Sequence, residues 1–551
     1  MPSWIQKCIS IVIVTILLAS AVYAYRIPIV LELISLYFDN KMQPGENQKI
    51  VWASGRDPRP KEERPPNVIL ILADDLGWND ITFNGGGVAD GKVPTPNIDS
   101  IAADGVTFTN GYAANATCAP SRASLLSGRY STRFGFEFTP TPSGMMTIGR
   151  LAPDDPTRPL QSISHSADKT LAYEDMGMPS TEITIAELLK QKNYHTAHIG
   201  KWHVGENNGM DPNSQGFDES LLMASGLYLP KDSPEVVNAK QDFDFIDQFF
   251  WKVMRYAVRF NGGPPFQPSG HLTEYFTKEA VRVIENNRDR PFFLYLAHWA
   301  PHSPLQSSRE DYDALSDIEL HRERVYAGLI RGLDRGVGEV LKALKDNGLE
   351  DNTIVIFSSD NGGAGYLGLP DLNQPYRGWK SSFFEGGIHV PYFLRWPDQI
   401  EPGTTVNEAV HHFDLYTTIA NAAGASLPTD RKIDGVDLLP IVNGNTDSIQ
   451  NRALFWRSGA SQSALIDGWK LNISDPPGEN WLYDLANDPT EQNNLAQSHP
   501  EKLRELQTAL SQHNKEQPSS AWPAMISVPI NLDRDDSQAN QANDEFIYWS
   551  N

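Results

Sequence analysis

Cysteine is scarce in this chain, which has two in 551 residues. Cys8 lies in an apolar N-terminal stretch, so removal of that stretch would leave Cys118 alone. An intramolecular disulfide is then excluded, and a hydrophobic core has to stabilise the fold. A single thiol left in an exported protein is either an inert buried residue or a site of chemistry.

Positive charge is also in short supply. The chain has 46 Lys and Arg against 69 Asp and Glu, a formal net charge of −23. Non-specific nucleic-acid binding needs a basic surface, so we expect no nucleic-acid partner. The acidic balance does not exclude a local cationic pocket. The length suits one large α/β domain with a smaller one.

The N-terminal 38 residues are predicted to direct the chain out of the cytoplasm. Lys7 precedes an apolar run over residues 8–24 that ends in small residues, the pattern of an export signal. A second apolar run, residues 27–38, follows at once, and the two together could form an uncleaved membrane anchor. Either reading predicts that the protein is exported. It would be periplasmic or secreted, with or without N-terminal membrane association. Residues 39–66 are polar and proline-rich and are expected to form a linker.

Four short apolar runs predict strands that are buried on both faces: residues 67–73, 194–199, 291–297 and 353–359. Helical patterns lie between them, at residues 184–190 and 324–344. This alternation predicts a mixed, mostly parallel sheet flanked by helices over residues 67–440. Short alternating runs and a helix from Pro500 predict a smaller antiparallel sheet plus helix over residues 441–525. Residues 526–551 are acidic and are expected to be a loosely held polar tail.

Polar residues follow each of the four predicted strands. In open α/β sheets ligands bind beyond the carboxyl ends of the strands, so these side chains are expected to meet in one site. They are Asp74 and Asp75, then Lys201 and His203, then His302, then Asp360 and Asn361.

Cys118 is expected at the start of a helix. Pro120 suits the first turn, and Gly128 is expected to end the helix. The free N–H groups and the dipole at such a position favour an anion. Arg122 lies one helical turn further on and faces the same way.

The run Cys118-Ala-Pro-Ser-Arg122, followed by Ala-Ser-Leu-Leu-Ser-Gly-Arg129, resembles the signature of the type I, formylglycine-dependent sulfatases of the alkaline-phosphatase-like superfamily. The resemblance implies that a formylglycine-generating maturation enzyme oxidises Cys118 to an aldehyde, formylglycine. Its hydrate would attack the sulfur of a sulfate ester. Similar runs extend the resemblance from about residue 67 to residue 495.

Residues 73–78 and 359–363 resemble the two metal-binding runs of that family. The resemblance implies that Asp74, Asp75, Asp360 and Asn361, with the modified Cys118, hold one metal ion. Three carboxylates and an amide oxygen suit a hard cation such as Ca²⁺ or Mg²⁺ and not zinc. The resemblance favours Ca²⁺.

Three further runs imply catalytic roles. In residues 200–205, Lys201 would bind the sulfate, and His203 would hold the aldehyde hydrate or take its proton. In residues 300–306, His302 would contact the sulfate and protonate the leaving oxygen. In residues 377–391, Lys380 is the expected catalytic lysine, and His389 stands where the family usually has arginine. Arg122 completes the expected catalytic set.

The sequence therefore predicts a hydrolase of sulfate monoesters. An exported sulfatase without disulfides suggests a bacterial enzyme that removes sulfate from a sulfated polysaccharide. The alternatives are an arylsulfatase of small aryl sulfates, a phosphomonoester or phosphonate-ester hydrolase of the same superfamily, and a non-catalytic binding protein. Segments 140–180, 226–272 and 363–376 fit no shared motif and are expected to line the pocket mouth. Their candidate contacts are Arg158, His165, Lys169, Arg255, Tyr256, Arg259 and His271.

Overall fold

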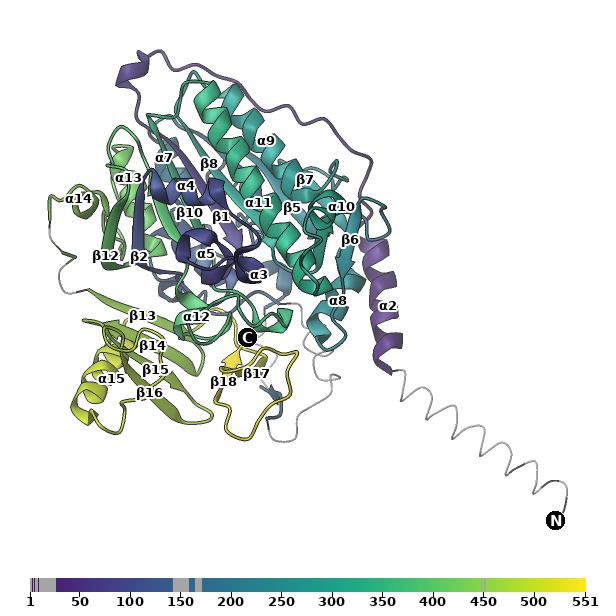
Figure 1. The fold of residues 1–551 in the computed structure, drawn as a ribbon. Coiled ribbons are helices and arrows are strands. Elements are labelled where there is room, and N and C mark those ends of the chain that lie inside the picture. The colour runs from purple at the N-terminus through teal and green to yellow at the C-terminus, as the bar shows by residue number, and fades with distance from the viewer. Residues whose placement is uncertain are drawn as a thin grey trace.

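A computed structural model describes residues 26–141, 158–163, 171–446, 448–449 and 452–551, together with residues 2, 4 and 8. The predicted signal at residues 8–24 lies almost entirely outside these. A nine-stranded sheet forms the centre of the molecule (Figure 1). Its strands, in spatial order, are β12 (Thr404–His411), β2 (Val106–Tyr112), β11 (Tyr392–Arg395), β10 (Thr353–Ser359), β1 (Asn67–Asp74), β8 (Phe292–Pro301), β4 (His195–Gly200), β5 (Glu219–Gly226) and β7 (Tyr256–Phe260).

The four predicted strands are four adjacent strands of this sheet, in the order β10, β1, β8, β4, and they are parallel to one another. Every residue in them is buried, which explains why β1, β8 and β10 are largely apolar. Strand β4 also buries His195, Thr196 and His198. β11 and β7 run antiparallel to their neighbours. The prediction of a mixed, mostly parallel sheet is confirmed.

Helices cover both faces of the sheet (Figure 1). Because successive side chains of a strand point to opposite faces, Ile69 and Ile71 pack on one side and Val68 and Leu70 on the other. The first side is covered by α4 (Pro96–Ala103), α9 (Leu272–Asn286) and α11 (His321–Asp346). The second is covered by α5 (Cys118–Ser127), α7 (Ile185–Lys190) and α13 (His412–Ala422).

A four-stranded antiparallel sheet with one helix lies below the large sheet, as predicted (Figure 1). Leu506 of the helix packs on Leu471 and Leu482 of the sheet. The elements are β13 (Ala453–Ser458), β14 (Ser461–Ile466), β15 (Trp469–Ser474), β16 (Glu479–Asp484) and α15 (Pro500–Lys515).

The expectation of a loosely held tail after residue 525 is wrong. Strands β17 (Ile526–Asn531) and β18 (Phe546–Ser550) form a hairpin, and β17 also pairs with β3 (Gln161–Ser162). Trp549 is buried in the same cluster as Leu454 of β13. The apolar run at residues 546–549 is short, so the acidic composition around it concealed a strand.

The expected linker is bound to the domain along part of its length. Trp52 is buried, and its Nε1 donates to Glu279 of α9 at 2.8 Å. The N–H of Ala53 donates to Glu219 at the start of β5. Before it, α2 (Arg26–Lys41) packs on α8 (Phe245–Val253), so the second half of the predicted anchor is a helix on the protein surface. Among the described residues no helix is long and apolar enough to cross a membrane.

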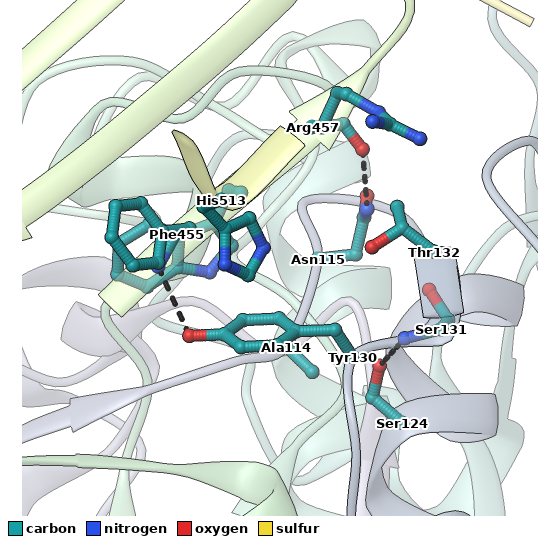
Figure 2. A pocket seen from close by; sticks show the side chains of 10 residues that line it. Ala114, Asn115, Ser124, Tyr130, Ser131, Thr132, Phe455, Arg457 and His513 are labelled. Atoms are coloured by element: carbon teal, nitrogen blue, oxygen red, sulfur yellow. Dashed lines mark hydrogen bonds between the residues drawn. The ribbon is translucent and has the colours of Figure 1, made fainter. Parts of the chain in front are cut away.

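Figure 2 shows the seam between the C-terminal sheet and the loop that precedes α5. The small pocket there is lined in part by His513 of α15, whose ring stacks on Phe455 at 4.3 Å and meets Tyr130 edge-on at 4.6 Å. The Tyr130 hydroxyl accepts from the N–H of Phe455, and Asn115 donates to the carbonyl of Arg457. The C-terminal sheet therefore holds the backbone close to Cys118.

A buried ion cluster ties the C-terminal sheet to the segment that carries Lys380. Lys470 of β15 is fully buried, and its Nζ lies 2.5 Å from Glu385 Oε1 and 3.1 Å from Glu491 Oε1. His389 Nδ1 lies 2.8 Å from the other oxygen of Glu385. Burial acts to raise the pKa of Glu385, but Lys470 and His389 outweigh it and hold that pKa at about 2.

We expect Lys470→Met to destabilise the protein by about 3–5 kcal/mol, because it leaves two buried carboxylates without their cation. The midpoint and slope of urea unfolding measure this loss. Lys342→Met is the matched control: Lys342 forms an exposed ion pair with Asp346, so its loss should cost less than about 1 kcal/mol. Equal costs for the two variants would contradict a role of the cluster in joining the sheets.

Candidate active site

The ends of β1 and β10 bring two acidic runs together. The N–H of Asp360 donates to the carbonyl of Ala73 at 3.1 Å, and the N–H of Asp75 donates to Asp360 Oδ1 at 3.2 Å. Asp74, Asp75, Asp360 and Asn361 are all buried. Asp75 has a φ of 61°, a left-handed conformation that directs the chain away from the strand at this point.

Cys118 is the first residue of α5, and Gly128 ends that helix with a φ of 71°, as predicted. The thiol lies 3.5 Å from Asp74 Oδ1 and 3.7 Å from Asp75 Oδ1. Burial, reinforced by the charge of Asp360, raises the pKa of the Cys118 thiol far above its usual range. Because the thiolate is the reactive form of cysteine, the thiol itself is a poor nucleophile here.

Arg122 is fully buried one turn along the same helix. Its Nε donates to Asp360 Oδ2 at 2.8 Å, and its terminal nitrogen lies 3.3 Å from Asp74 Oδ2. The other terminal nitrogen donates to the carbonyl of Lys201 at 3.0 Å. This side chain therefore connects three strand ends, those of β1, β4 and β10.

Two lysines neutralise the carboxylates of the first acidic run. Lys201 Nζ lies 2.6 Å from Asp74 Oδ2, and Lys380 Nζ lies 2.7 Å from Asp75 Oδ2. Burial alone would raise the pKa of Asp75, but the charges of Lys380 and Lys201 outweigh it and hold that pKa well below its usual range. Asp75 is therefore ionised.

His302 lies beside Lys380 at the end of β8. Its Nδ1 is 2.6 Å from the carbonyl oxygen of Ser303, which can only accept, so we assign the proton to Nδ1. Nε2 then has a lone pair and lies 3.4 Å from Lys380 Nζ. The ring stacks on Trp299 at 3.9 Å. Burial lowers the pKa of His302 well below its usual value, so the ring is neutral.

His203 follows Lys201 by two residues and has a φ of 64°. Its Nδ1 is buried and has no hydrogen-bond partner among the described residues. Burial, with the charges of Lys201 and Arg122, lowers the pKa of His203 well below its usual value. The ring is therefore a neutral side chain beside the cations of the site.

The donor atoms of this site fit a hard cation. Ligand atoms of Asp74, Asp75, Cys118 and His302 lie within 4.8 Å of one another. Asn361 Oδ1 is buried without a hydrogen-bond partner in the described part of the chain, while its Nδ2 donates to Asp75 Oδ1 at 2.8 Å. Carboxylates beside an amide oxygen that lacks a partner match the ligand chemistry of Ca²⁺ or Mg²⁺. The structure adds His302 to the neighbourhood of the predicted ligands.

Tyr366 is a site residue that the motifs do not reveal. Its hydroxyl donates to Asp75 Oδ2 at 2.9 Å and lies 3.3 Å from Lys380 Nζ. It comes from the unmatched segment 363–376, in the short helix η7 (Gly365–Leu367). The position of that segment directly after Asp360 and Asn361 was the one signal for it in the sequence.

Most of the candidate pocket-mouth residues serve the fold. Arg158 donates to the carbonyls of Gln541 and Asp544, and Tyr256 is buried. His271 stacks on Tyr228. Two others bond nearby groups: Arg259 pairs with Glu206, and Arg255 donates to the carbonyls of Lys252, Met254 and Ser35. His165 and Lys169 lie outside the described residues.

Comparisons with known proteins identify the family of this chain. The family model described as Sulfatase matches residues 66–425. A second model, described as N-sulphoglucosamine sulphohydrolase, C-terminal, matches residues 378–518. The residues of the site described above all lie within the first match. The chain belongs to the sulfatase family, in the alkaline-phosphatase-like superfamily, and is a sulfuric ester hydrolase.

Relatives of known name agree with this family. N-acetylgalactosamine-6-sulfatase of Mus musculus is 33% identical over 414 residues, which cover 74% of this chain and 71% of the relative. Steryl-sulfatase of Rattus norvegicus is 30% identical and covers 81% and 89%. A structure of Ps i-CgsB in complex with k-i-k-neocarrahexaose is 29% identical, has a TM-score of 0.69 and covers 83% and 95%. The family implies a metal ion and a formylglycine made from cysteine.

We expect Tyr366→Phe to lower kcat for an aryl sulfate by about 10- to 100-fold. A hydrogen bond to a charged group contributes about 1.5–3 kcal/mol, and this one holds Asp75 beside Lys380. Steady-state kinetics with nitrophenyl sulfate measure kcat and KM separately. Tyr376→Phe is the control, because the contact of Tyr376 with His389 is a ring stack that remains when the hydroxyl is removed. Unchanged kcat in Tyr366→Phe would show that the hydroxyl does not position the site.

Proposed function

We propose that this chain removes sulfate from a sulfated carbohydrate, using a formylglycine derived from Cys118 and one divalent metal ion. The observation that carries the proposal is the position of Cys118. It begins a helix, it is buried against Asp74 and Asp75, and burial among these carboxylates raises its pKa and favours the protonated thiol. A precursor of another nucleophile accounts for such a cysteine better than a nucleophilic thiol does.

Asp74, Asp75, Asp360 and Asn361 would hold the metal, and we propose Ca²⁺ because all four offer oxygen donors. When bound, the metal would polarise the sulfuryl oxygens, and formylglycine would supply the nucleophile. A divalent cation would also release the lysines from their present partners. The Nζ atoms of Lys201 and Lys380 already lie against the metal-binding carboxylates, so they are placed to pair with the sulfate instead.

Lys380 and His302 are arranged to deliver a proton to the leaving oxygen. Burial opposes the charge of Lys380, but Asp75 outweighs it and raises the pKa of Lys380 well above its usual value. The sulfate would replace Asp75 as the negative partner when substrate binds, so the amine would stay protonated. His302 presents an unprotonated Nε2 to it at 3.4 Å. A proton can pass from Nζ directly to the substrate oxygen or through Nε2, and such general acid catalysis contributes about 10²–10⁴-fold.

Two relatives support a carbohydrate substrate by name. One is an N-acetylgalactosamine-6-sulfatase, and the other was solved with a neocarrahexaose. The N-terminal apolar run supports export, which would bring the enzyme to such substrates in the periplasm or outside the cell. The proposed activity also requires a formylglycine-generating maturation enzyme as a partner.

The direct test compares nitrophenyl sulfate with nitrophenyl phosphate after co-expression with a maturation enzyme. We expect kcat/KM for the sulfate to exceed that for the phosphate by at least about tenfold. Faster phosphate turnover would favour a phosphomonoesterase of the same superfamily instead.

Variants of Cys118 serve as controls for that test. Cys118→Ala should lower kcat by about a thousandfold or more in any host, because no nucleophile can then be made. Cys118→Ser should do the same unless the host oxidises serine. Intact mass that shows an unmodified Cys118 together with full activity would overturn the role of formylglycine.

The substrate class is tested by sulfate release from fragments of carrageenan, ulvan, fucoidan and glycosaminoglycans. We expect at least one of them to be desulfated with a kcat/KM above that for nitrophenyl sulfate, because sugar contacts outside the reacting centre add transition-state binding. Release confined to small aryl sulfates would leave the reaction intact but overturn the carbohydrate assignment.

A further inference from the structure

The exposed face of α2 has a row of large apolar side chains. Ile29, Leu33 and Leu36 are 44%, 61% and 53% exposed, respectively. Their spacing of four and three residues places them on one side of the helix. Scattered single apolar residues are normal on a protein surface, but a continuous stripe along a helix marks a contact surface. We call these three residues the α2 stripe.

The opposite side of α2 is already fixed to the protein. Leu31 and Phe249 of α8 are buried against each other, and Ser35 donates to the carbonyl of Lys252 at 3.0 Å. Lys252 also pairs with Glu32. Figure 1 shows α2 at the edge of the molecule beside α8. These contacts fix the rotation of α2 about its axis, so the α2 stripe stays on the outward side of the helix.

The chain directly before α2 indicates what covers the stripe. Residues 8–24 are the most apolar run of the sequence, and α2 begins two residues after them. If that run enters a bilayer, Leu36 lies about 15 Å along a helix that starts at the membrane boundary. A stripe of aliphatic side chains on such a helix suits the zone between headgroups and acyl chains. The acidic side chain at the edge of the α2 stripe, Glu32, is paired with Lys252.

We propose that the α2 stripe docks on the surface of a lipid bilayer. This contact is independent of the proposed activity. It also fixes which side of the enzyme faces the membrane, because α8 lies between α2 and the active site. The ring of Phe250 in α8 is 6.1 Å from the ring of His302. Docking through the α2 stripe would hold the α8 side of the active site toward the lipid.

Quenching of tryptophan emission by brominated lipid tests this contact. The full chain is mixed with phosphatidylcholine vesicles whose acyl chains are brominated near the headgroup end. We expect the emission that Leu36→Trp adds to the wild-type spectrum to fall by at least about half, because the new indole would lie at the depth of the bromines. Thr508→Trp, at an exposed position of α15, is the control and should keep its added emission.

Three outcomes would overturn the proposal. Equal emission of Leu36→Trp with and without brominated lipid would show that α2 faces water even when residues 8–24 bind the vesicle. A blue-shifted Leu36→Trp spectrum before vesicles are added would show that another protein segment or a second copy covers the stripe. Loss of quenching when salt is raised tenfold would assign the contact to charge, since apolar burial is not screened by salt.

Discussion

The pairing of three buried carboxylates with three cations is the interaction on which the site depends. Asp74, Asp75 and Asp360 are buried at the ends of neighbouring strands, where an unpaired charge would cost several kcal/mol. Their partners are Lys201, Lys380 and Arg122. Each cation comes from a different part of the chain, so the site is complete only when the large sheet, α5 and the segment around Lys380 have all assembled.

The same balance explains how one site can hold both a metal ion and an anionic substrate. The paired charges cancel in the described structure, so the site has no excess of either sign to neutralise. A divalent cation would add positive charge beside the carboxylates with which the lysines now form ion pairs. The lysines and the metal would then present a positive surface to the sulfate, which is the group that the reaction must bind and polarise.

Three of the central strands, β1, β8 and β10, could be predicted from the sequence because burial on both faces makes them largely apolar runs. Strand β4 contains two histidines, and its short length and the glycine at its end made it predictable. The polar residues after them could also be predicted, since the carboxyl ends of parallel strands share one edge. The role of Tyr366 could not be predicted. Its position depends on a loop that folds back onto Asp75, and no local sequence pattern indicates that fold. Lys470 is similar: nothing in β15 indicates that its side chain would be buried against Glu385 and Glu491. Strand β18 could not be predicted, because the 26 residues after position 525 are acidic on average and this average hides the five residues that form the strand.

The backbone around Cys118 is held by segments that are synthesised much later. The N–H of Ser381 donates to the carbonyl of Ala116, and Trp456 donates to that of Ala113. Strand β13 lies more than three hundred residues downstream of Cys118. At about 5–20 residues per second, the ribosome reaches it tens of seconds after it has made Cys118. A maturation enzyme of the kind proposed above would have that interval in which to reach the thiol before the C-terminal sheet can close over the adjoining backbone.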